Sequence, residues 1–141
     1  MSVFIMSPTT SYTDSPSGSY ANGANTWIET TNPIDLSGAV AAELLFHHRY
    51  TTEASYDFCN VEASTDGGST WYPVCAKYSG NNGAWEEETF SLEEFCGTAA
   101  FKLRFRLTAD SYITAEGWYV DDVAILGPAP GNVQPTAPTL D

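Results

Sequence analysis

Residues 99–108, AAFKLRFRLT, alternate between apolar and basic side chains along most of their length. Successive residues of a β-strand point to opposite faces, so this stretch has one apolar and one basic face. The basic face holds Lys102, Arg104 and Arg106. The apolar face comprises Phe101, Leu103, Phe105 and Leu107. The pattern predicts a strand with one face in a core and the other outside.

The same two-residue period recurs along the chain, and helical periodicity is almost absent. Only 91–97, SLEEFCG, has room for one helical or 3₁₀ turn. No alternation of strands with helices occurs, which excludes a parallel α/β sheet. We therefore predict an all-β fold, a two-sheet antiparallel jelly-roll-like sandwich. Its expected strands are 2–6, 25–30, 44–50, 56–64, 71–78, 85–91, 99–108 and 117–126, with 56–64 and 71–78 forming a hairpin.

The stretch STDGGSTW, 64–71, fits the S-x-D-x-G-x-T-W pattern of an Asp-box hairpin. In such a turn Asp66 would cap backbone amides, Gly68 would take a positive φ, and Trp71 would pack under the hairpin. The motif predicts a hairpin and is uninformative about chemistry.

Composition limits the classes of partner. The chain has 18 acidic and 5 basic residues, a net charge of −13. Phosphate binding needs a basic surface, so we expect no nucleic acid partner. No apolar run reaches the ~20 residues that span a bilayer, so we expect no membrane insertion. The start, MSVFIMSPTT, lacks signal-peptide features, and we favour a mature or excised piece of an extracellular protein over a cytosolic one.

The last stretch, 127–141, holds four of the eight prolines and no aromatic residue. It is typical of an extended linker or a docking arm. We therefore predict one sandwich domain over 1–126 and a Pro-rich linker or arm over 127–141.

Three cysteines occur without a CxxC or Cys/His metal spacing. Cys59 shares a strand face with Val61, which predicts a buried thiol. We expect Cys75 and Cys96 to form a disulfide, which would contribute roughly 3 kcal/mol.

The stretch 117–125, GWYVDDVAI, places two aspartates in an otherwise apolar strand. Strict alternation puts Asp121 on the face of Val123 and Ile125, so we expect it to point inward. Asp57 likewise shares a face with Cys59. A buried carboxylate needs a compensating partner.

Three stretches together carry a family resemblance: SYTDSPSGSYANGANTWIETTNPIDLSG, then YDFCNVEASTDGGSTW, then FKLRFRLTADSYITAEGWYVDDVAI. Over about 10–126 the chain resembles the MAM-like jelly-roll domain of secreted bacterial metallopeptidases of the immune inhibitor A type, a relative of the gingipain cleaved adhesin domain. The resemblance implies a calcium-stabilised β-sandwich without an active site of its own.

Calcium takes six to eight oxygen ligands, chiefly carboxylates and carbonyls. We hypothesise that Asp57 and Asp121 converge on one calcium ion with some of the acidic residues in nearby loops. The full candidate set is Asp14, Glu53, Asp57, Asp110 and Asp121. The alternative is that each buried carboxylate pairs with Arg49, His48 or loop backbone amides.

Two further surfaces are candidate binding sites. The basic residues Arg49, Lys102, Arg104 and Arg106 suggest a surface for an acidic glycan or an acidic face of another copy. The alternative is charge balance by cross-strand Glu62 or Asp122. Tyr78 and Trp85, which flank the loop SGNNGAW, are candidate sugar-stacking residues.

No catalytic constellation is apparent. His47 and His48 are adjacent on a strand and point apart, and no nucleophile elbow, phosphate loop or HExxH motif occurs. We expect a non-catalytic extracellular accessory or adhesion module that contacts a protein or glycan. The alternatives are a filament subunit that docks on copies of itself through its terminal strand or tail, and a carbohydrate-binding module.

Overall fold

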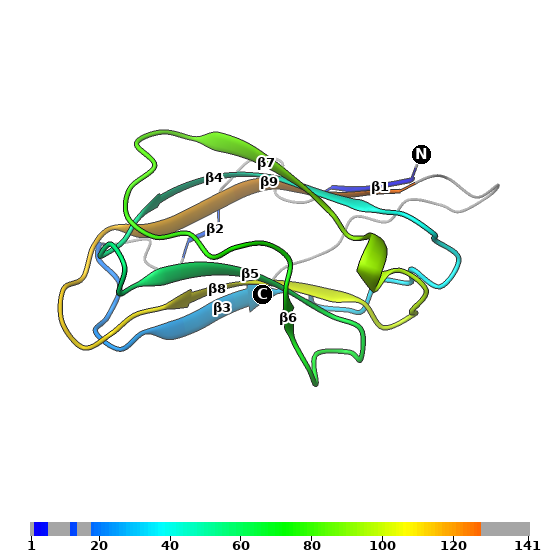
Figure 1. Cartoon of the computed structure of the whole chain (residues 1–141), viewed down its shortest axis with the longest axis horizontal. Coiled ribbons are helices and arrows are strands. Elements are labelled where there is room, and N and C mark those ends of the chain that lie inside the picture. Colours follow the sequence, from blue (N-terminus) through cyan, green and yellow to red (C-terminus); the bar gives the residue numbers. More distant parts are fainter. Residues whose placement is uncertain (1, 6–11, 14–17, 128–141) are drawn as a thin grey trace.

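Two antiparallel β-sheets lie face to face in the computed structural model, which describes residues 2–5, 12–13 and 18–127 (Figure 1). The first sheet has the order β1 (Ser2–Ile5), β9 (Gly117–Gly127), β4 (Glu43–Thr51) and β7 (Glu86–Ser91), with β2 (Tyr12–Thr13) also paired to β9. The second has the order β3 (Asn25–Glu29), β8 (Lys102–Thr108), β5 (Phe58–Ser64) and β6 (Tyr72–Pro73). The predicted all-β sandwich is confirmed.

The core lies between the sheets, where the apolar faces of the central strands meet. Phe46 of β4 packs edge-to-face on Phe105 of β8, with ring centroids 5.3 Å apart, and Phe105 packs on Trp118 of β9 at 5.5 Å. The apolar face predicted for 99–108 is buried. One 3₁₀ turn, η1 (Glu93–Phe95), falls inside the predicted segment 91–97. No helix within the described ranges is long enough to cross a bilayer.

The Asp-box hairpin joins β5 to β6 as predicted. The Asp66 carboxylate accepts hydrogen bonds from the amides of Ser69 and Thr70 at 3.0 and 2.8 Å. Gly68 has a φ of 101°, and the indole N–H of Trp71 donates to the Gly68 carbonyl at 3.0 Å. The motif acts as a structural clamp on this turn.

A β-bulge in β9 breaks the alternation that we expected around the two aspartates. The register pairs Leu45 with Ala124 but His47 with Asp121, so β9 holds one extra residue there. Asp122 has a φ of +50° and is exposed, while Val120 and Val123 are both buried. The expectation that Asp121 points inward with Val123 is therefore wrong, because the bulge shifts the alternation by one residue.

The positive φ of Asp122 in the bulge leads to a prediction about the stability of variants at this position. Valine disfavours a positive φ, so Asp122→Val should lower the free energy of unfolding by about 1–2 kcal/mol. Asp122→Asn should remain within about 0.5 kcal/mol of the wild type, because asparagine tolerates this conformation. Urea unfolding of both variants measures the difference. Equal stability of the two variants would mean that β9 has no left-handed residue at this position.

The predicted disulfide does not form, because each sulfur has a different neighbour. The Cys75 thiol lies 3.8 Å from the Tyr78 hydroxyl, and the Cys96 thiol lies 3.5 Å from the Leu92 carbonyl. None of the three cysteines forms a disulfide within the described residues, and Cys59 is buried as predicted. The linker or arm predicted over 127–141 lies, except for Gly127, outside the described residues.

Candidate metal centre

Three acidic side chains meet where three strands end. Glu53 follows β4, Asp57 precedes β5 and Asp110 follows β8. Each offers a carboxylate oxygen that lies within 4.8 Å of those of the other two. We call these residues the acidic triad. Asp57 is fully buried, and Glu53 and Asp110 are partly exposed.

A tight turn between β4 and β5 brings the first two members together. The amides of Tyr56 and Asp57 both donate to the Glu53 carbonyl, at 3.2 and 2.9 Å. Ser55, within this turn, has a φ of 69°. The Ser79 hydroxyl donates to the Asp57 carbonyl at 2.7 Å and fixes the turn against the loop before β7. The turn therefore holds Glu53 and Asp57 side by side on a braced backbone.

The buried Asp57 carboxylate has two protein donors. The Tyr20 hydroxyl donates to Oδ2, and the Asp110 amide donates to Oδ1 at 2.9 Å. The Tyr20 oxygen in turn accepts from the Glu53 amide at 3.2 Å. A loop amide is one of the partners that the sequence left open. Tyr20, 37 residues away, is a partner that sequence reasoning missed.

The other two alternative partners lie elsewhere. Arg49 pairs with Glu116 at 3.2 Å, and His48 hydrogen-bonds Glu88 at 3.0 Å. Neither of these contacts involves Asp57, whose negative charge is held by one hydroxyl and one amide.

Glu53 carries the strongest indication of an additional ligand. Its Oε1 atom is buried and has no hydrogen-bond partner among the described residues. Burial raises the pKa of the Glu53 carboxyl, and the neighbouring carboxyls of Asp110 and Asp57 raise it further. Three carboxylates within 4.8 Å of one another repel, and a cation between them would turn that repulsion into attraction.

The remaining predicted ligands do not extend the triad. Asp121 pairs in register with His47, six residues before Glu53 and roughly 20 Å along an extended strand. Its carboxylate accepts from the Asp122 amide at 2.8 Å. Asp14 lies outside the described residues. The structure therefore brings together three of the five predicted ligands.

The predicted basic surface divides between the two sheets. Arg49 lies on β4 of the first sheet, whereas Lys102, Arg104 and Arg106 lie on β8 of the second. The expectation that all four share one face is wrong, because a two-residue period specifies a face but not a sheet. Asp122 also belongs to the first sheet and lies 3.7 Å from His47.

Ion pairs balance the three cations of β8. Glu62 of β5 binds Arg104 at 2.7 Å and Arg106 at 3.0 Å, as the charge-balance alternative proposed. Lys102 binds Glu29 at 2.6 Å. The Arg104 guanidinium also lies 4.2 Å from the Trp71 ring. These contacts tie β8 to both neighbouring strands and to the Asp-box turn.

The two candidate stacking residues differ in exposure. Tyr78 packs against His48 at 4.7 Å and Tyr50 at 5.5 Å, so much of its ring is covered. Trp85 is exposed directly before β7. Only Trp85 of this pair offers an open ring.

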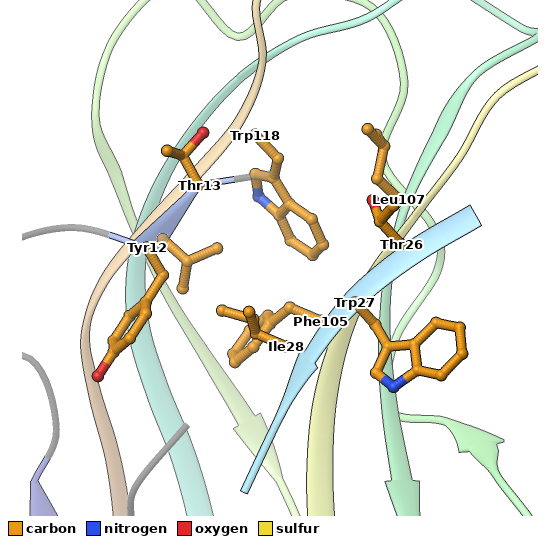
Figure 2. Close-up of a pocket in the computed structure, with 9 residues that line it drawn as sticks. Tyr12, Thr13, Thr26, Trp27, Ile28, Phe105, Leu107 and Trp118 are labelled. Carbon is orange, nitrogen blue, oxygen red and sulfur yellow. The ribbon is translucent and has the colours of Figure 1, made fainter. Parts of the chain in front are cut away.

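An apolar cavity of about 290 Å³ opens between the sheets, and no residue of the triad lines it. Figure 2 shows Tyr12 and Trp118 on one side of it and Ile28 and Phe105 on the other, with the Trp27 side chain directed away. No charged side chain lines it within the described part of the chain.

Comparison with known proteins places the chain in a family. A model of the immune inhibitor A-like MAM domain matches residues 2–129. Immune inhibitor A of Bacillus thuringiensis subsp. alesti is 33% identical over 109 residues, which are 72% of this chain and 15% of that protein. Bacillopeptidase F of Bacillus subtilis (strain 168) is 29% identical over 115 residues, 82% of this chain and 8% of that protein.

A solved structure of infectious bursal disease virus, Gx strain, has a TM-score of 0.54 over 98% of this chain and 34% of that chain. At 11% identity this likeness shows a shared fold alone. The chain spans only a small part of the length of either curated relative, and the matched part is about the size of one domain. The match over residues 2–129 shows that the chain belongs to the immune inhibitor A-like MAM domain family.

Proposed function

We propose that this chain is a calcium-stabilised, non-catalytic accessory module of an extracellular peptidase. Its place in the MAM domain family and its similarity to a small part of Bacillopeptidase F support the accessory role. The single observation that carries the calcium site is the acidic triad with its unpartnered Glu53 oxygen.

The donor set suits calcium. Carboxylate oxygens are the hard ligands that calcium prefers, and its flexible coordination tolerates an irregular arrangement of loops. Glu53, Asp57 and Asp110 would hold the ion, which would neutralise their mutual repulsion. The ion would thereby join the β4–β5 turn to the end of β8 and stabilise the contact between both sheets at this end.

The environment of His48 supports a non-catalytic role. Its Nδ1 accepts from the Trp118 indole N–H at 3.0 Å, and its Nε2 donates to Glu88 at 3.0 Å. Both ring nitrogens are therefore occupied in a fully buried side chain. This imidazole has a structural function as a polar bridge within the core.

Thermal unfolding tests the ion. The chain in excess calcium should melt several degrees above the same chain in excess EGTA, because an ion that binds only the folded state stabilises it. Glu62→Gln serves as a control, since it removes a carboxylate far from the triad and should leave the calcium-dependent shift intact. A melting temperature that is equal in calcium and EGTA would contradict the proposal.

A further inference from the structure

The end of the sandwich that carries the acidic triad also carries exposed aromatic side chains. Tyr112 is 80% exposed and Tyr56 is 63% exposed, the two highest values among the described aromatic side chains. Ile113 beside Tyr112 is 63% exposed. In Figure 1 the loops after β4 and β8, which carry these residues, meet at the left end.

Backbone hydrogen bonds connect both tyrosines to the triad. The Tyr56 amide donates to the Glu53 carbonyl at 3.2 Å. The Tyr112 amide donates to the Asp110 carboxylate at 3.1 Å. An ion held by Glu53 and Asp110 would therefore also fix the two segments that present the rings.

We propose that this end of the sandwich is a calcium-dependent binding site for a neutral glycan. The ion takes vicinal hydroxyl oxygens of a sugar, and the rings of Tyr56 and Tyr112 stack on sugar faces. This inference rests on the proposed calcium site and assigns it a ligand.

The coordination requirement of calcium leaves room for such a ligand. Three carboxylate oxygens fill only part of a shell of about six to eight, and the other positions fall to carbonyls, water or ligand hydroxyls. Glu53 and Asp110 are partly exposed, so an ion held by them would be open to solvent on that side. A sugar diol supplies two adjacent oxygens without adding charge.

The small number of exposed apolar side chains and the negative charge at this end favour a neutral sugar over a protein or an anionic ligand. Two tyrosines and one isoleucine cover far less than the ~800 Å² per partner of a stable protein interface. The net charge of −13 and the three carboxylates disfavour an anionic ligand. Tyrosine rings combine an apolar face with a polar edge, which suits a pyranose ring.

A glycan array tests the inference directly. The full chain is applied to an array of neutral and acidic oligosaccharides, once in calcium and once in EGTA. We expect retention on neutral glycans in calcium only. In titrations with the best neutral oligosaccharide, Tyr56→Ala and Tyr112→Ala should each weaken binding about tenfold, with melting temperatures close to the wild type.

Tyr72→Ala is the matched control, because Tyr72 is 51% exposed on β6 of the second sheet. It should bind as the wild type does. No neutral glycan retained in calcium, retention that persists in EGTA, or binding unchanged in both loop variants would each overturn the inference. If EGTA lowers the melting temperature but no glycan on the array retains the chain, the glycan site is wrong and the calcium site is supported. If EGTA changes no melting temperature, the ion itself fails.

Discussion

Asp57→Ala is expected to lower the free energy of unfolding by about 3 kcal/mol in EGTA, and by more than that in calcium. The substitution leaves the Tyr20 hydroxyl and the Asp110 amide without their acceptor in a site where Asp57 is fully buried. It also removes one of three carboxylates from the proposed ion. Chemical denaturation in both buffers measures the loss.

Asp57→Asn separates these two effects. An amide keeps one oxygen for the Asp110 N–H, but its NH₂ group faces the Tyr20 oxygen, so one protein contact survives and the Tyr20 hydroxyl loses its acceptor. In EGTA this variant should lose less stability than Asp57→Ala, because the Asp110 contact is kept and the repulsion within the triad is relieved. In calcium it should fall below the wild type. A variant that gains as much from calcium as the wild type would exclude Asp57 as a ligand.

His48→Phe is the second large expected effect, a loss of about 3 kcal/mol at pH 8. The phenyl ring removes the acceptor of the Trp118 indole N–H and one hydrogen-bond partner of the Glu88 carboxylate. Phe46, Tyr78 and Trp118 all pack against the imidazole, so no water can readily replace it. Urea unfolding at fixed pH gives the value.

The wild type should also lose stability in acid through His48. Burial lowers the pKa of His48, although the hydrogen bond to Glu88 and the charge of Glu86 act in the opposite direction. The unfolded chain, with an ordinary pKa of about 6.5, therefore takes up its proton at a higher pH than the folded chain. The contribution of His48 to the free energy of unfolding is complete above pH 6.5. It falls as the pH decreases towards the lower pKa of His48 in the folded state.

The pH dependence distinguishes His48 from the surrounding carboxylates. Between pH 6.5 and 5 the wild type should lose stability relative to His48→Phe, by at most about 1.4 kcal/mol per pH unit. His47→Gln is the matched control, because His47 is partly exposed and contacts Glu87 and Asp122 at the surface. It should keep the wild-type slope. Parallel curves for the wild type and His48→Phe would mean that His48 does not titrate in this range.

The strands could be predicted because their pattern is local. In β8 every second side chain is apolar from Phe101 to Leu107, and each is buried. The same pattern did not reveal the bulge, because strict alternation was assumed through Asp121 and Asp122. The signal was present in the sequence: Val120 and Val123 are three residues apart, a spacing that places both in the core only if a residue is inserted between them.

The candidate site could be predicted only in part, because its contacts are long-range. Glu53 and Asp57 belong to one turn and were readily paired from the sequence. Asp110 joins them through the pairing of β5 with β8, which brings Phe58 opposite Thr108. Tyr20 lies in a loop without periodicity, so no local pattern marks it as a partner of Asp57. Arg49 was assigned to the wrong surface for a related reason. The two-residue alternation of its strand shows which residues share a face, but it does not show to which sheet the strand belongs.

An anomalous difference map from crystals grown in calcium tests the central claim most directly. The account predicts one strong peak among Glu53, Asp57 and Asp110, at about 2.3–2.6 Å from an oxygen of each carboxylate. The same map from Asp57→Asn crystals should lose that peak. Electron density for water alone between the three side chains of the wild type, in crystals that contain calcium, would contradict the account.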